Sequence, residues 1–230
     1  MAKIAVVYHS GGNRTGRQAE AIARGCASVP GVEVAVYPLS ADQVGPDMRW
    51  RDRQMMEELK EVDGILFGSV TYFGTVSAVF KAFLEGTFGL WYDQSFKDKW
   101  AGGFTNSGSF NGDKQVTLMM LLTYAAQMGM FWVPMGDHPG ANHAEAPQDD
   151  INRLGAFLGP MAMSEPDSDP NRFPTPGDIL TAERYGERFA SVVRHWTREG
   201  NYVTPRAVDA AATAALKKAG VSASEAFLTS

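Results

Sequence analysis

The chain has 230 residues, long enough to bury a full core in one large domain or two small ones. Its 26 acidic and 21 basic side chains leave a formal net charge of -5 at pH 7, so the sequence lacks the basic surface of a nucleic-acid-binding protein. Four histidines and one cysteine provide neither a Cys/His metal cluster nor a disulfide within the chain, so we expect no metal site and a reducing compartment.

Apolar runs of strand length alternate with longer amphipathic stretches along most of the chain. The predicted strands cover, in chain order, residues 3–8, 32–39, 63–70, 101–107 and 130–135. The predicted helices cover residues 15–29, 51–61, 77–88, 114–129 and 178–196. This alternation implies right-handed crossover connections, and therefore an α/β fold with a doubly wound, five-stranded parallel sheet covered by helices on both faces.

Two segments interrupt the alternation. Residues 136–176 are rich in Pro, Gly and Asp and longer than an ordinary connection, which predicts a functional excursion or an oligomer contact. From Pro205 onward an alanine-rich stretch predicts one short helix and a tail. We therefore expect a main domain over residues 1–200 and a C-terminal extension over residues 201–230. The N-terminus lacks the pattern of a secretory signal, so we expect a cytoplasmic protein.

The residues SGGNRT at 10–15 join the first predicted strand to the first predicted helix, where free N–H groups and the helix dipole form an anion site. Ser10 and Thr15 add hydroxyl donors, and Asn13 adds an amide. Gly11 and Gly12 let the backbone fold closely around a phosphate. The same residue types are ordinary helix caps, so this stretch alone leaves both interpretations open. It lacks the spacings typical of P-loop ATPases and of classical dinucleotide-binding dehydrogenases.

Two more loops of small and polar residues follow the third and fourth predicted strands. One spans residues 71–75 and the other lies within residues 104–117. The carboxyl ends of parallel strands meet at the crevice where doubly wound sheets bind ligands, which lies between the first and third strands when the order is 2-1-3-4-5. Short polar side chains beside Phe73, Phe110 and Trp91 suit the polar edge and the flat faces of an isoalloxazine ring.

At these residues the chain resembles the flavodoxin-like superfamily, and within it the WrbA-type NAD(P)H:quinone oxidoreductases. The stretches that carry the likeness are SGGNRT at 10–15, T-x-F-G, V-S-A and F-L-E-G-T within 71–87, G-L-W at 89–91, T-x-S-G-S with a following Gly at 105–112, GMFWVPMG at 129–136 and LTAERYGERFASVV at 180–193. The resemblance covers about residues 3–196. It implies a flavodoxin-like sheet and FMN as the cofactor.

The resemblance also implies a set of site residues. The first loop would hold the FMN phosphate, the second would border the ring and the third would bind its polar edge. The implied cofactor-binding residues are Ser10, Gly11, Gly12, Asn13, Arg14, Thr15, Thr71, Tyr72, Phe73, Gly74, Asn106, Ser107, Gly108, Ser109, Phe110 and Gln127. Trp91 would bind the substrate across a subunit contact of a homodimer or homotetramer. Gly12, Arg14 and Gln127 depart from the family pattern, where Tyr, His and His are common, so the quinone preference stays open.

The implied reaction is a two-electron, ping-pong transfer from NAD(P)H to a quinone or a similar aromatic acceptor, with both substrates using one place on FMN. No catalytic side chain is implied. His138 and His143 in the long loop are interpreted as solvated residues, and the alternative is that they line the site. Two alternatives remain: a flavodoxin-type electron carrier that docks on partner proteins, and a reductase of nitro or azo compounds.

Overall fold

The computed structural model describes residues 1–167, 169 and 171–199. Its strands are β1 (Ala2–His9), β2 (Val32–Leu39), β3 (Gly64–Tyr72), β4 (Thr75–Val76), β5 (Trp100–Ser107), β6 (Phe131–Trp132) and β7 (Met161–Met163). Its helices are α1 (Arg14–Ala27), α2 (Arg53–Lys60), α3 (Ala78–Gly86), α4 (Phe88–Tyr92), α5 (Lys114–Gln127) and α6 (Pro176–Glu199), with a short 3-10 turn, η1, at Ala41–Gln43. Most predicted elements are present, with ends shifted by a few residues.

The sheet has the predicted strand order. Its main path runs β2-β1-β3-β5-β6, and every neighbouring pair on this path is parallel. Counting only these strands gives the order 2-1-3-4-5. β2 is added on one side of β1 and the later strands on the other, so the switch point lies between β1 and β3. The loops that follow β1, β3 and β5 therefore emerge side by side at the carboxyl edge of the sheet.

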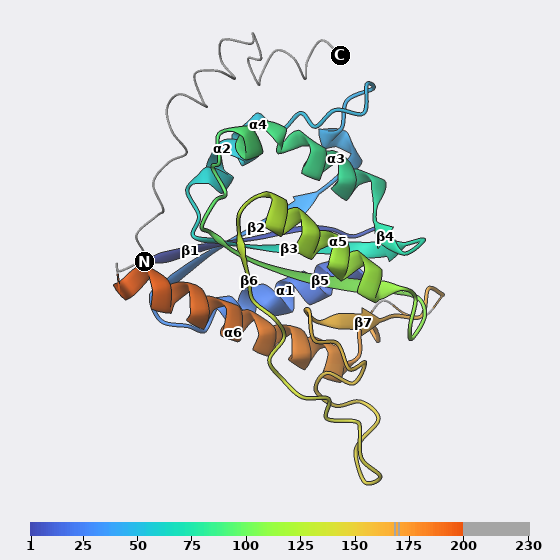
Figure 1. Cartoon of the computed structure of the whole chain (residues 1–230). Coiled ribbons are helices and arrows are strands. Elements are labelled where there is room, and N and C mark those ends of the chain that lie inside the picture. Colours follow the sequence, from blue (N-terminus) through green and yellow to red (C-terminus); the bar gives the residue numbers. More distant parts are fainter. Residues whose placement is uncertain (168, 170, 200–230) are drawn as a thin grey trace, which may run out of the picture.

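Helices cover both faces of the sheet (Figure 1), α1 and α6 on one and α2, α3, α4 and α5 on the other. Val6 and Val7 are both fully buried although neighbouring side chains of a strand point to opposite faces. Val7 packs in the core shared with α2, α3 and α5, whereas Val6 packs in the core shared with α1 and α6. This two-sided burial is the reason for the continuous apolar runs in the sequence.

Glycines allow α1 and α6 to pack backbone against backbone. A Cβ atom on Gly25 of α1 would overlap the carbonyl of Glu183, and one on Gly186 of α6 would overlap the carbonyl of Ile22. The close approach holds the long helix α6 against α1, the helix that follows the first loop.

The fifth strand predicted at residues 130–135 is present but shorter, because β6 covers only Phe131–Trp132. β6 pairs with the start of β5 and β7 pairs with its end, so two short strands occupy this edge. Between them the chain leaves the sheet after Val133 and passes through Pro134, which has no N–H to donate to a ladder. The excursion extends away from the sheet (Figure 1) and returns where Gly159 lies directly against the backbone of Gly103.

The helix predicted over residues 77–88 ends at Gly86, and Trp91 lies in the separate short helix α4 that follows Thr87. The predicted C-terminal helix and the extension at 201–230 lie outside the described residues. None of the helices in the described part of the chain has the length and apolarity that a membrane span requires.

Candidate active site

The first loop leaves backbone donors available at the start of α1. Asn13 adopts the left-handed conformation, with φ of 58°, and its side chain makes no capping hydrogen bond. The first bond of the helix runs from the Arg17 N–H to the Asn13 carbonyl at 3.0 Å. Within the described part of the chain, the N–H groups of Gly11 and Gly12 donate to no acceptor. The loop thus presents the donors of an anion site rather than a closed helix cap.

The Ser10 hydroxyl supports the same interpretation. Its Oγ atom is buried and has no hydrogen-bond partner among the described residues. Buried hydroxyls are normally satisfied, so an orphaned one beside free N–H groups fits the oxygen of a bound phosphate. Gly11 lies so close to the Tyr72 hydroxyl that a Cβ atom there would overlap it, which brings the first and second loops together. These features fit the phosphate end of FMN.

The second loop is a tight hairpin between β3 and β4. Tyr72 pairs with Thr75, which leaves Phe73 and Gly74 as the two turn residues. Both have positive φ, 48° and 76°, as a type I′ turn requires. A bulky residue in this conformation costs about 1–2 kcal/mol, and such strain clusters at functional sites. The Phe73 ring is fully exposed, so the hairpin holds an aromatic face out at the edge of the crevice.

The Thr71 hydroxyl takes part in a buried network below this hairpin. Its Oγ1 lies 2.7 Å from Thr105 Oγ1 and 2.8 Å from Thr117 Oγ1. Thr105 in turn donates to the Ser69 carbonyl at 2.7 Å. The network ties the ends of β3 and β5 to α5. Thr71 therefore contributes to the edge by fixing the spacing between the second and third loops.

The third loop is held by polar contacts from three elements. Asn106 Nδ2 donates to Ser164 Oγ, just after β7, at 2.8 Å. Lys114 at the start of α5 is fully buried, and its Nζ donates to Ser107 Oγ at 2.8 Å, to the Ser109 carbonyl at 2.6 Å and to the Phe110 carbonyl at 2.9 Å. Burial lowers the pKa of Lys114 to about 8.

A buried ion pair lies next to this loop. Arg153 from the excursion makes two hydrogen bonds to Asp178 of α6, at 2.8 and 2.9 Å, and the two side chains are 9% and 2% exposed. Burial raises the pKa of Asp178, although Arg153 and the Met163 N–H both act to lower it. The Arg153 guanidinium also lies over the Phe110 ring, 5.8 Å from its centroid. Excursion, helix α6 and third loop are thereby joined.

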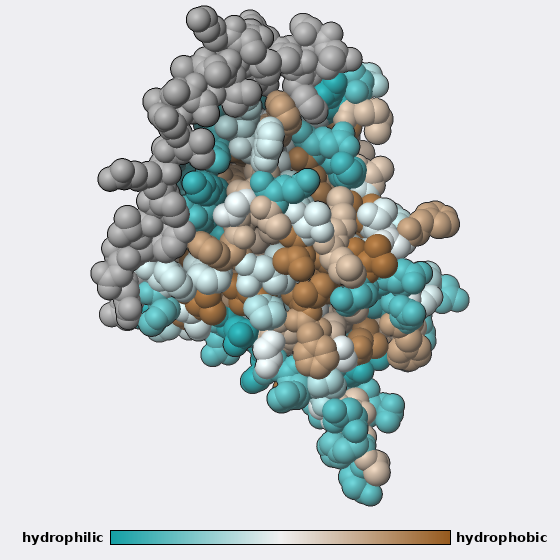
Figure 2. Space-filling view, in the orientation of Figure 1, coloured by the Kyte–Doolittle hydropathy of each residue, from teal (hydrophilic) through white to brown (hydrophobic). Residues whose placement is uncertain are grey.

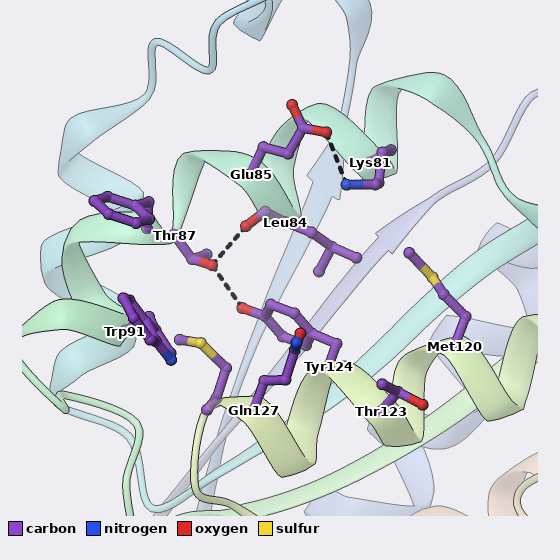
Figure 3. A pocket seen from close by; sticks show the side chains of 11 residues that line it. Lys81, Leu84, Glu85, Thr87, Trp91, Met120, Thr123, Tyr124 and Gln127 are labelled. Carbon is purple, nitrogen blue, oxygen red and sulfur yellow. Dashed lines mark hydrogen bonds and ion pairs between the residues drawn. The ribbon is translucent and has the colours of Figure 1, made fainter. Parts of the chain in front are cut away.

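Trp91 and Gln127 lie apart from the three loops. They line a groove of about 650 Å³ between α3–α4 and α5, and Figure 3 shows their side chains at the same end of it, Trp91 from α4 and Gln127 from α5. The Thr87 hydroxyl and the Tyr124 hydroxyl, 2.8 Å apart, close its floor. Gln127 ends α5, a helix of 14 residues that begins beside the third loop, so it lies about 20 Å from that loop. One chain does not bring Gln127 to the other predicted cofactor residues.

Arg14 and three histidines make other contacts or lie elsewhere. Arg14 Nη2 donates to the Pro166 carbonyl at 3.0 Å, which fastens the segment after β7 to the first loop. His9 ends β1, and burial lowers the pKa of its imidazole. His138 and His143 are exposed on the excursion, as the sequence interpretation expected.

Comparison with known proteins identifies the family. Residues 2–143 match the family model described as NADPH-dependent FMN reductase. The chain belongs to this family. It is 38% identical over 192 residues to flavodoxin FldP of Pseudomonas aeruginosa (strain UCBPP-PA14), covering 84% of this chain and 97% of that protein. It is 36% identical over 149 residues to quinone-oxidoreductase QR2 of Triphysaria versicolor, covering 61% of this chain and 72% of that protein.

A solved structure agrees. The WrbA-like flavodoxin from Agrobacterium tumefaciens has 32% sequence identity and a TM-score of 0.63, covering 85% of this chain and 99% of that chain. The predicted flavodoxin-like fold and WrbA-type resemblance are confirmed, as is FMN as the cofactor. The family member described here is an FMN-dependent NAD(P)H oxidoreductase.

The sequence interpretation missed the buried charges around the third loop. For Lys114 the sequence contained one signal of an unusual environment. A lysine in the first turn of a helix is unfavourable beside the positive end of the helix dipole unless its ammonium has acceptors elsewhere. For Arg153 and Asp178 the sequence contained no such signal, because their pairing joins the excursion to α6 only in the folded chain.

Proposed function

We propose that this oxidoreductase holds FMN across the three loops and passes two electrons from NAD(P)H to a quinone or a similar aromatic acceptor. The observation that carries the placement is the buried, unpartnered Ser10 hydroxyl beside the free N–H groups of Gly11 and Gly12. In this placement the phosphate lies at residues 10–15, and the ring lies between residues 71–74 and 106–110.

The residues of the chain bind and orient rather than react. The first loop supplies N–H and hydroxyl donors to the phosphate, and the backbone of the exposed residues 108–111 supplies donors to the polar edge of the ring. Phe73 and Phe110, which are exposed on opposite loops, offer aromatic surface to flat molecules that stack there. When bound, FMN supplies the redox chemistry, accepting a hydride and passing on two electrons. Because both substrates would use the same face, the kinetics should be ping-pong.

We further propose that Trp91 and Gln127 act across a subunit contact. In one chain they are distant from the loops, yet Trp91 is 47% exposed and lines an open groove. Apolar side chains gather over α5 on this side of the molecule (Figure 2), among them the exposed Val116 and Met119. A second copy covering this surface would bury them and bring Trp91 to a neighbouring flavin site, in a closed homo-oligomer.

An electron carrier is the second candidate, favoured by the 38% identity to a protein called a flavodoxin. One experiment separates the two functions. The protein saturated with FMN is mixed with NADPH in the absence of oxygen, and the visible absorption of FMN is followed. An enzyme loses the absorption within its turnover time and regains it on addition of a quinone, with parallel lines in double-reciprocal plots. A carrier that docks on partner reductases keeps its absorption, which would contradict the proposal.

A further inference from the structure

We propose that Lys114 is a positioning residue that favours the reduced form of FMN, acting through the peptide groups and the charge of the third loop. The inference rests on the proposed placement of FMN, which puts the polar edge of the ring against this loop. Lys114 belongs to neither the phosphate loop nor the hairpin.

The first part of the argument is the direction of the peptide groups. The carbonyls of Ser109 and Phe110 accept hydrogen bonds from Lys114 Nζ and therefore point toward it. A trans peptide group is planar, with its N–H pointing opposite to its carbonyl, so the N–H groups of Phe110 and Asn111 turn away from the lysine. Neither N–H has an acceptor within the described part of the chain, and both residues are exposed. They are available as donors to a ligand on the outer side of the loop.

The second part is the balance of charge. All three acceptors of the Lys114 ammonium are neutral oxygens. The nearby carboxylate of Asp178 is already bound by both arms of the Arg153 guanidinium. Arg153 Nε also lies 3.7 Å from a second carboxylate, that of Asp149, whose side chain is 40% exposed. The Lys114 ammonium donates to no carboxylate among the described residues, and its positive charge lies in a buried position where solvent screens it weakly. The third loop lies directly against this charge.

These features act differently on the two redox forms. Two-electron reduction with uptake of one proton leaves FMN with one more negative charge than the oxidised form. Preoriented N–H donors and a weakly screened positive charge stabilise that added charge more than they stabilise the oxidised ring. Lys114 should therefore strengthen the binding of reduced FMN relative to oxidised FMN, which raises the midpoint potential.

The test uses the full chain loaded with FMN, and three variants. Lys114→Met removes the charge and all donors, Lys114→Gln keeps a neutral donor, and Lys3→Gln removes a positive charge from the amino end of the sheet as the control. We expect both Lys114 variants to weaken the binding of reduced relative to oxidised FMN at least tenfold, which lowers the midpoint potential by about 30 mV. Lys3→Gln should leave the potential unchanged. An unchanged potential in both Lys114 variants overturns the inference.

A measurement on the parent protein covers the case in which the variants do not fold. Between pH 7 and 10 the buried ammonium, which faces Asp178 of α6 and Arg153 of the excursion, loses its proton. Reduction should then take up a second proton, so the midpoint potential should fall twice as steeply with pH above about pH 8. A constant slope overturns the inference. Failure of the parent to bind FMN would instead overturn the proposed site.

Discussion

The loops at the carboxyl edge of the sheet and the groove between α3–α4 and α5 differ in the chemical groups that line them. The loops consist of backbone N–H groups and short side chains at the ends of adjacent parallel strands, such as Ser10 and Asn106. The groove consists of long side chains on helix surfaces, such as Trp91 and Gln127. One chain therefore completes the first arrangement, because the sheet sets its spacing, whereas the second is left open to solvent. Cofactor binding should belong to the single chain and the substrate wall to the assembly.

The largest expected effect concerns the loops, and specifically the proposed phosphate site. Ser10→Ala together with Thr15→Ala should weaken FMN binding about a hundred-fold or more, since each charge-assisted bond to the phosphate contributes about 1.5–3 kcal/mol. Quenching of FMN fluorescence measures the affinity. The exposed pair Ser191→Ala with Thr197→Ala is the matched control. If the first double variant holds FMN as tightly as the control, the phosphate binds elsewhere.

Removing the ion pair beside the third loop should have the next largest effect. Asp178→Asn leaves the buried Arg153 guanidinium with a neutral amide and with Asp149, a 40% exposed carboxylate 3.7 Å away, so the free energy of unfolding should fall by about 3 kcal/mol, the lower end of the range for breaking a buried ion pair. Urea denaturation of the apoprotein measures it. Asp47→Asn breaks an ion pair in which both side chains are about half exposed, and it should leave the free energy of unfolding almost unchanged. Equal losses in the two variants would show that burial of the pair is unimportant.

The groove is tested by Trp91→Ala. The variant should raise the Michaelis constant for the acceptor about tenfold and weaken assembly, because a stacked aromatic contact contributes about 0.5–1.5 kcal/mol in addition to its buried area. FMN affinity should stay the same. Trp196→Ala, with a similarly exposed indole outside the groove, is the control for kinetics. A monomeric parent in sedimentation, or unchanged acceptor kinetics in the variant, would separate the groove from the active site.

The smallest expected effect concerns Phe73, the strained aromatic residue of the second loop. Phe73→Gly relieves about 1–2 kcal/mol of strain at positive φ and costs about 0.5–1 kcal/mol of backbone entropy, so stability should rise by about 0.5–1 kcal/mol. The Michaelis constant should rise as the aromatic surface is lost. Phe73→Ala removes the same ring without relieving the strain, so it should raise the Michaelis constant with no gain in thermal stability. A Phe73→Gly variant with unchanged kinetics would assign the ring no part in binding.

Several features of this protein follow from sequence alone. The alternation of buried strands and amphipathic helices determines a parallel sheet, and the loops at residues 10–15, 71–75 and 104–117 mark its carboxyl edge because their residue types suit turns and anion sites. These signals are local, since each strand, helix or loop is encoded by neighbours along the chain. That is why the parallel sheet and the loops at its carboxyl edge were predictable from local patterns, whereas the flavodoxin-like strand order and FMN were implied by the family resemblance.

Other features were decided only when distant segments met. The fifth strand divides into β6 and β7 because the excursion returns to β5 at Gly159, a contact that periodicity does not encode. Lys114 becomes buried only because the third loop turns its carbonyls toward it, and Arg153 finds Asp178 only across the packed end of α6. The position of Gln127 depends on the direction of α5 relative to the sheet. Pairings between distant segments leave no periodic trace in the sequence, because their energy comes from burial and from charges brought together by folding.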